Sequence, residues 1–254
     1  MAQNFREPDI LRIARKEGKV TVEDLALRFG VTVQTIRRDL SDLADDGKLD
    51  RVHGGAVLAS SVVNIGYEDR RGLHDEAKDD IASICAQAIP DGSSLFLNIG
   101  TSTEALARAL LHHQNIMVVT NNMNVANILA ANSDCQIIVS GGTLRRSDGG
   151  LVGSIAISTI EQFKVDIAVV GCSALDEDGD LLDFDVQEVS VSQAIVRQAR
   201  KTYLVADHSK FQRNAPIRIA SLKDIAGIFT DKPLSEALAQ KCKNWGTAIH
   251  TTTN

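Results

Sequence analysis

The first 57 residues place their apolar positions at the spacing of short α-helices. Helices are expected over residues 8–17, 22–29 and 33–46. Thr21 and Thr32 precede the second and third helices as N-caps, because a threonine hydroxyl can accept from a free amide of the first turn. Gly18, Gly30 and Gly47 follow the three helices, as glycine commonly does at a helix end. The chain therefore begins with a small helical unit.

The third helix separates an apolar face from a polar one. Its apolar residues recur with a period of 3.6 and are Val33, Ile36, Leu40 and Leu43. The polar side carries amide, hydroxyl and guanidinium groups, on Thr32, Gln34, Thr35, Arg37, Arg38 and Ser41. Such groups read base edges in the major groove of DNA and hold its phosphates. The nearby acids, expected to keep the rest of the helix away from the phosphates, are Asp39, Asp42, Asp45 and Asp46.

Two helices joined at a glycine and followed by two short strands are typical of a winged helix-turn-helix. The turn is expected at Gly30, and the wing is expected to carry Arg51 and His53. The alternative is a helical subdomain whose arginines serve only solubility. Because the caps, the turn, the polar face and the wing agree, we favour a DNA-binding domain over residues 1–57. Its partner would be double-stranded operator DNA.

Charge changes how this domain is expected to bind. The 254-residue chain has a net charge of −6, and residues 1–57 hold ten basic and ten acidic residues. Nucleic-acid-binding domains are often strongly basic. Any affinity for DNA must therefore come from where the charges lie and not from their sum.

Residues 76–254 alternate apolar runs with helical patterns, after a linker expected over residues 58–75. Strands are expected within residues 94–100, 116–120, 135–142, 165–175, 202–207 and 226–231. Helices are expected within residues 101–111, 121–132, 154–163, 186–200 and 233–244. Runs that are apolar throughout are typical of strands buried on both faces. The expected fold class is α/β, with a mostly parallel sheet covered by helices on both sides.

Several classes of protein and site are not indicated. The chain lacks an apolar run long enough to span a membrane and lacks a signal-peptide core, so a cytoplasmic location is expected. The cysteines, which are scattered and read as buried thiols without a metal, are Cys85, Cys135, Cys172 and Cys242. The glycine patterns of dinucleotide and ATP sites are also missing, so no cofactor is expected.

A ligand site is expected where the strands end, because ligands of open α/β sheets bind beyond the carboxyl ends of the strands. Gly100, Thr101, Ser102 and Thr103 follow the first strand, and Thr101 and Glu104 have the spacing of a capping box. This helix start suits an anion. The residues that follow the other strands are Asn121, Asn122, Gly141, Gly142, Gly171, Ser173, Asp207 and Lys210. We favour a polar pocket with Lys210 as its cation over the alternative that these residues only form turns.

Residues 21–56, TVEDLALRFGVTVQTIRRDLSDLADDGKLDRVHGGA, resemble the N-terminal signature of the DeoR family of bacterial transcriptional repressors. The resemblance continues through LNIGTSTEALARAL, VVTNNMNVAN, SGGTLRRSDGGLVG and VADHSKF, and so spans nearly the whole chain. It implies an effector domain like sugar-phosphate isomerases and CoA-transferases. The segments TNNMNVAN, RRSDGG, LLDFDVQEV and DHSKFQRNA are most like those of members that govern glycerol 3-phosphate metabolism. The implied effector is therefore a small phosphorylated polyol or sugar, glycerol 3-phosphate.

The resemblance also implies roles for single residues. Thr101, Ser102 and Thr103 would hold the phosphate, with Lys210 as the neutralising charge. Asp207 and Asn122 would face the polyol hydroxyls, and Lys78 matches a recurrent lysine near the same mouth. Asn98 departs from the family, which often has aspartate there.

Other functions remain open on the sequence alone. The larger domain could be a sugar-phosphate isomerase with a regulatory appendage, for which Asp183, Asp185, Glu188 or Asp207 could be the base. Turnover of ribose 5-phosphate or glucosamine 6-phosphate would favour that reading. A regulator could also activate instead of repress. One small, neutral helix-turn-helix domain buries too little surface for tight specific binding to DNA. A homo-oligomer is therefore expected, either a dimer or a tetramer. Its contacts would involve apolar helices such as residues 154–163.

Overall fold

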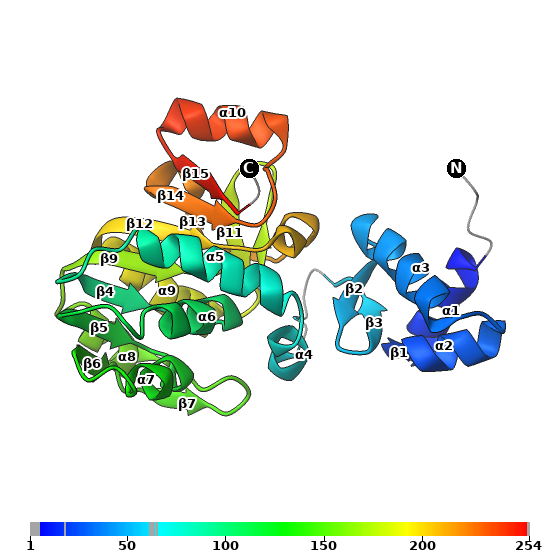
Figure 1. Cartoon of the computed structure of the whole chain (residues 1–254), viewed down its shortest axis with the longest axis horizontal. Coiled ribbons are helices and arrows are strands. Elements are labelled where there is room, and N and C mark those ends of the chain that lie inside the picture. Colours follow the sequence, from blue (N-terminus) through cyan, green and yellow to red (C-terminus); the bar gives the residue numbers. More distant parts are fainter. Residues whose placement is uncertain (1–5, 18, 61–63, 65, 253–254) are drawn as a thin grey trace. The chain divides into compact units, whose positions relative to one another are not determined.

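The computed structural model describes residues 6–17, 19–60, 64 and 66–252 and divides the chain into two compact units (Figure 1). The first unit ends at Leu73 and the second begins at His74. Among the described residues, none of the helices combines the length and the apolar character that crossing a membrane requires.

The first unit packs three longer helices against a small antiparallel sheet and also contains a short fourth helix. Its helices are α1 (Glu7–Glu17), α2 (Val22–Phe29), α3 (Val33–Asp45) and the short α4 (Tyr67–Arg71). Its strands are β1 (Lys19–Thr21), β2 (Leu49–Val52) and β3 (Gly55–Leu58), in the order β1-β3-β2. The core joins Ile10, Leu25 and Ile36 from the three longer helices. The strands β2 and β3 form the predicted wing, whereas β1 was not predicted.

The predicted caps of this unit are confirmed. The Thr21 hydroxyl accepts from the amide of Asp24 at 3.2 Å, and the Thr32 hydroxyl accepts from the amide of Thr35 at 3.1 Å. Gly30 ends α2 with a φ of 63°, a left-handed conformation that favours glycine. Gly18, predicted to end the first helix, lies outside the described residues.

One predicted role in this unit is wrong. Asp39 was expected among the acids that keep α3 away from DNA, but its side chain is buried. The guanidinium of Arg6 holds its carboxylate with two hydrogen bonds, of 2.6 and 3.1 Å. Asp39 is therefore oriented toward the interior of the unit.

Replacing Arg6 with alanine removes both hydrogen bonds from the buried carboxylate. We expect the free energy of unfolding to fall by about 1–3 kcal/mol, as measured by urea denaturation followed by circular dichroism. Arg12→Ala is the matched control, because Arg12 and its partner Asp9 are exposed. Equal stability of the two variants would contradict this role for Arg6.

Parts of the segment predicted as a linker, residues 58–75, form regular secondary structure. Strand β3 reaches Leu58, α4 occupies Tyr67–Arg71, and the next helix begins at Asp75. Residues 61–63 and 65 of this segment lie outside the described residues. A five-residue helix gives too short an apolar pattern to be recognised in the sequence.

The second unit is built on a seven-stranded parallel sheet of order β15-β14-β12-β9-β4-β5-β6. Its strands are β4 (Ser94–Leu97), β5 (Ile116–Thr120), β6 (Cys135–Val139), β9 (Val165–Val170), β12 (Ala199–Val205), β14 (Gly227–Thr230) and β15 (Ala248–Thr251). Its helices are α5 (Asp75–Gln87), α6 (Thr101–Ala109), α7 (Met123–Leu129), α8 (Ser154–Ile160), α9 (Val186–Arg197) and α10 (Glu236–Trp245), with the 3-10 turns η1 (His208–Gln212) and η2 (Leu222–Asp224). The predicted mostly parallel α/β sheet is confirmed.

Alternate residues of the strands serve two cores. Leu95 and Leu97 of β4 pack in one core with α5, α6 and α7, whereas Phe96 packs in the other with α8, α9 and α10. The two groups of helices therefore cover opposite faces of the sheet, as predicted for strands buried on both sides. Figure 1 shows α5 and α6 together on one of these faces.

Short antiparallel strands lie outside this sheet. Apart from Ala174–Leu175, which falls within the run predicted over residues 165–175, they were not predicted. One hairpin pairs β7 (Thr143–Arg145) with β8 (Gly150–Val152). A separate sheet has the order β10-β11-β13, from Ala174–Leu175, Asp180–Asp183 and Ile217–Ser221. Strands of two to five residues with mixed polarity carry little periodic signal, which is why only the long apolar runs were recognised.

Candidate functional site

The polar face of α3 is exposed, as a DNA-reading surface must be. Gln34, Arg37 and Arg38 project from the helix, and within the described part of the chain no hydrogen bond or ion pair holds either guanidinium. Thr32 and Thr35 contribute hydroxyls that lie 2.9 Å apart at the N-terminus. The face therefore presents two unengaged cations beside amide and hydroxyl groups.

The wing contacts the same helix. A guanidinium nitrogen of Arg51, on β2, donates to the backbone carbonyl of Arg37 at 3.2 Å, and Ser41 donates its hydroxyl to that carbonyl at 2.9 Å. Burial and the neighbouring charge of Arg37 lower the pKa of Arg51. His53 is exposed at the turn between β2 and β3. Arg51 thus fixes the wing against α3, and Ser41 has a local partner in addition to any DNA contact.

In the second unit, the predicted strand-end residues lie along one edge of the sheet, because all of its strands run parallel. They do not form a single small pocket. Neighbouring strands are about 4.8 Å apart, so the ends of β12 and β6, which have β9, β4 and β5 between them, are about 19 Å apart. The ends of β12 and β6 are therefore too far apart for one three-carbon ligand to contact both strands.

A group of charged residues gathers at the end of β12. The Nζ atom of Lys210 lies 3.8 Å from Oδ2 of Asp207, and the Asp207 side chain is 1% exposed. Lys78, from the first turn of α5, is buried and donates to Asp75 at 3.3 Å. Burial lowers the pKa of Lys78, and the nearby charge of Lys210 lowers it further. The positive charges of Lys78 and Lys210 therefore lie close enough to act on one another, and both act on Asp207. Two neighbouring positive charges make the site favourable for an anion.

One carboxylate oxygen of Asp207 is ion-paired with Lys210 but accepts no hydrogen bond among the described residues. Its Oδ1 accepts from the amide and the hydroxyl of Ser209, but its buried Oδ2 has no hydrogen-bond partner among the described residues. Burial alone would raise the pKa of Asp207, but the charge of Lys210 and the hydrogen bonds from Ser209 outweigh it and hold the pKa well below its usual range. An ionised acceptor without a donor suits a ligand hydroxyl.

The turn before α6 differs from its prediction. The capping box of Thr101 and Glu104 is wrong, because the N-cap is Gly100, with a φ of 147°, and no side chain caps the helix. The Thr103 hydroxyl donates to the carbonyls of Asn98 and Gly100, both at 2.8 Å, so Thr103 secures the turn and is fully buried. Thr101 and Ser102 stay partly exposed and remain candidates for the anion.

Two buried amides join the strand ends. Asn98 accepts from the amide of Gly171 at 3.2 Å and donates to Ser192 at 3.3 Å, which links β4, β9 and α9. An ionised aspartate could make the second contact only by accepting from the Ser192 hydroxyl, so the amide at Asn98 sets the direction of this hydrogen bond. Asn122 caps α7 through its oxygen and donates to Glu104 at 3.3 Å. Its side chain is buried and makes these structural contacts, which favours a role in folding over the predicted contact with polyol hydroxyls.

Ser173 and the paired glycines also have structural roles. Ser173 is buried and donates to Asp183 at 3.1 Å. Gly142 has a φ of 110°, and a Cβ there would lie 2.6 Å from the carbonyl oxygen of Val152. Gly141, with a φ of 70°, precedes it in the same turn, which brings the β7–β8 hairpin back toward α8. These contacts favour a role in folding over direct contact with an effector.

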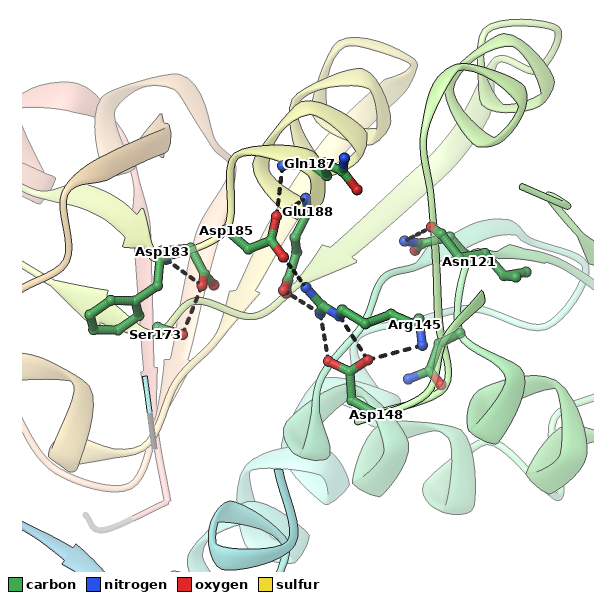
Figure 2. Close-up of polar contacts among 12 residues, drawn as sticks. Asn121, Arg145, Asp148, Ser173, Asp183, Asp185, Gln187 and Glu188 are labelled. Carbon is green, nitrogen blue, oxygen red and sulfur yellow. Dashed lines mark hydrogen bonds and ion pairs between the residues drawn. The ribbon is translucent and has the colours of Figure 1, made fainter. Parts of the chain in front are cut away.

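A cationic crosslink was missed altogether. Arg145 of β7 bonds Asp148 at 2.9 and 2.5 Å, Asp185 at 2.8 Å and Glu188 at 2.5 Å (Figure 2). Burial alone would lower the pKa of Arg145, but Asp148 and Glu188 outweigh it and raise the pKa. Asp185 also caps α9 through the amides of Gln187 and Glu188. The network ties the hairpin to α9. Asp185 and Glu188 are 40 and 43 residues from Arg145 in the sequence, so no local signal could reveal these contacts.

Two histidines near Lys210 were also missed. His208 donates its amide to Asp231 at 2.7 Å, and its Nδ1 lies 2.5 Å from the same carboxylate. The ring of His74 meets the ring of His208 edge to face, with centroids 5.0 Å apart. The motif DHSK could have indicated His208, but nothing in the sequence placed His74 there.

Comparison with known proteins covers both units. A family model described as the DeoR-like helix-turn-helix domain matches residues 6–62, and one described as the DeoR C terminal sensor domain matches residues 73–232. The glycerol-3-phosphate regulon repressor of Escherichia coli is 45% identical over 92% of this chain and 92% of that protein. The glycerol-3-phosphate regulon repressor of Haemophilus influenzae is 44% identical over 91% and 90%. Ribose 5-phosphate isomerase A from Neisseria gonorrhoeae is a solved structure that aligns with a TM-score of 0.40 and 14% identity, over 55% of this chain and 54% of that chain.

Proposed function

The chain belongs to the DeoR family and is a DNA-binding transcriptional repressor rather than an enzyme, and we propose that glycerol 3-phosphate releases it from its operator. The observation that carries this proposal is the high identity, over nearly the full length, to repressors named for the glycerol 3-phosphate regulon. The genes it controls would be those of glycerol and glycerol 3-phosphate metabolism.

The geometry around Asp207 supports a phosphorylated polyol. Lys78 and Lys210 supply positive charge for a phosphate. Oδ2 of Asp207, which accepts no hydrogen bond among the described residues, supplies an acceptor for a hydroxyl. Thr101 and Ser102 open α6, whose free amides favour an anion. These groups span a short stretch of the sheet edge, from β12 to β4, which suits a small ligand.

The acids once considered for an isomerase base are engaged otherwise. Asp185 and Glu188 pair with Arg145, and Asp183 accepts from Ser173. A general base needs a carboxylate oriented toward the substrate carbon. Asp207 is paired with Lys210, and its low pKa makes it a weak base.

We also propose that the protein acts on DNA as a homo-oligomer, a dimer or a tetramer, in the bacterial cytoplasm where the operator lies. One helix-turn-helix domain contacts a single half-site of the operator, and two such domains are needed for tight specific binding. Large apolar side chains that are exposed beside the β6 edge, Val139, Leu144 and Ile155, support such an assembly.

The proposal is tested by a DNA-shift assay on the upstream region of the gene itself. We expect glycerol 3-phosphate to release the DNA, whereas glycerol and inorganic phosphate do not, because only the ester offers both the charge and the hydroxyls. Typical coupling predicts a loss of operator affinity of about 5- to 150-fold. Release by ribose 5-phosphate or glucosamine 6-phosphate, with no effect of glycerol 3-phosphate, would contradict the choice of effector.

A further inference from the structure

His74 stands where the chain enters the sensor unit, directly after the last residue of the first unit. It is the N-cap of α5 and has a φ of 54°, a left-handed conformation that is uncommon for a residue other than glycine. Its carbonyl accepts from the amide of Lys78 at 2.9 Å, so its backbone sets the first turn of α5. Strain of this kind persists only where surrounding contacts hold the residue in place, and it concentrates at ligand sites and switches.

The ring of His74 is held against the charged group at the end of β12. Its edge-to-face contact is with His208, which is fixed in turn by Asp231. The charged and titratable groups that act on His74 are Asp207, His208 and Lys210 from the segment after β12, and Lys78 from its own helix. Among these, Asp207 is the one with a buried oxygen that lacks a hydrogen-bond partner within the described residues.

These neighbours favour a neutral imidazole while the site is empty. Burial lowers the pKa of His74, and the charges of His208, Lys210 and Lys78 act in the same direction against the opposing charge of Asp207. A phosphate dianion placed among Lys78, Lys210 and His74 reverses the balance, because a nearby negative charge stabilises the protonated ring.

We propose that His74 is a third cationic ligand of the effector phosphate, beside Lys78 and Lys210, and that it takes up one proton from solvent when the effector binds. The inference rests on the proposed function, since it assumes a phosphorylated effector at this site. It adds a binding residue and a link between the effector site and the point where the chain leaves that unit for the DNA-binding one.

The sign of the pH effect follows from proton uptake. Where the bound form carries one more proton than the free form, effector affinity rises as pH falls, by at most about tenfold per pH unit. The effect is confined to the interval between the pKa of His74 in the free protein, below its usual 6.5, and its higher pKa in the complex. The second pKa of a phosphate ester, about 6, sets the lower limit of a clean measurement.

The test is calorimetric titration of the full-length protein with glycerol 3-phosphate between pH 6.5 and 8.5, in pairs of buffers with different ionisation enthalpies. The parent is expected to take up a measurable fraction of a proton per site near pH 7 and to bind more tightly at the lower pH. His74→Asn keeps a polar side chain that tolerates the left-handed backbone but cannot be protonated. It is expected to lose most of the proton uptake and to bind about three- to tenfold more weakly at pH 6.5, with little change at pH 8.5.

Controls separate His74 from its surroundings. His112→Asn replaces an exposed histidine and should behave as the parent. A circular dichroism spectrum and a thermal unfolding midpoint of His74→Asn equal to those of the parent confirm that the variant is folded. Unchanged proton uptake in His74→Asn, or its loss only in His208→Asn, would overturn the proposal while leaving the effector in place. A parent protein that does not bind glycerol 3-phosphate would instead refute the proposed function itself.

Discussion

Replacing Lys210 with alanine is expected to leave operator binding intact and to make repression insensitive to glycerol 3-phosphate. Lys210 lies beside Asp207 and shares the site with Lys78, so its loss removes a large part of the positive charge available to a phosphate. A hydrogen bond to a charged group contributes about 1.5–3 kcal/mol, which corresponds to effector binding that is weaker by about 10- to 150-fold. The regulon would stay repressed while glycerol 3-phosphate accumulates.

The measurement is operator release in the DNA-shift assay, as a function of glycerol 3-phosphate. Lys210→Arg should retain most of the response, since it keeps the charge. Lys201→Ala, an exposed lysine on β12, is the control for loss of a charge elsewhere. If Lys210→Ala releases DNA at the same concentration of glycerol 3-phosphate as the parent, the phosphate is bound elsewhere.

Replacing Arg38 with alanine is expected to abolish the preference for operator over other DNA. Arg38 is exposed at the centre of the polar face of α3 and lacks a partner among the described residues, so its guanidinium is available to a base edge. Each lost base contact costs about 1–3 kcal/mol, or about 5- to 150-fold in affinity for the operator alone.

Arg37→Ala is the matched comparison for this prediction. The backbone carbonyl of Arg37 accepts hydrogen bonds from the side chains of Arg51 and Ser41. Arg37 therefore lies on the side of α3 that faces the wing, and we expect it to be closer to the DNA backbone. We expect its loss to weaken operator and scrambled DNA equally and to flatten the salt dependence. Fluorescence anisotropy on both duplexes at two salt concentrations distinguishes the two roles. Equal effects of both variants on both duplexes would contradict this assignment.

The helix-turn-helix could be predicted because its signals are local. A cap such as Thr32 and a left-handed glycine such as Gly30 act within one turn of their own helix, and both lie where expected. Asp39 could not be assigned, because its partner Arg6 is 33 residues away. Its helical position was compatible with either the surface or the core edge.

The edge of the sheet could be predicted, but the roles of its residues could not. Parallel strands must end together, so the placement of Asp207 and Lys210 followed from the alternation of strands and helices. Hydroxyls and amides that can hold a phosphate can equally close a turn, and Thr103 and Asn122 do the latter. The distance between the ends of β6 and β12 depends on the order of the strands in the sheet. This order could not be predicted from the sequence.

The expected division of roles places DNA on the α3 face and the effector at the edge of the sheet around Asp207 and Lys210. It is tested most directly by measuring both ligands on both variants, with operator by anisotropy and glycerol 3-phosphate by calorimetry. The predicted result is a crossed loss. Lys210→Ala binds operator but binds glycerol 3-phosphate poorly, and Arg38→Ala binds glycerol 3-phosphate but no longer prefers operator over scrambled DNA. Binding of glycerol 3-phosphate by Lys210→Ala with the affinity of the parent would contradict the account.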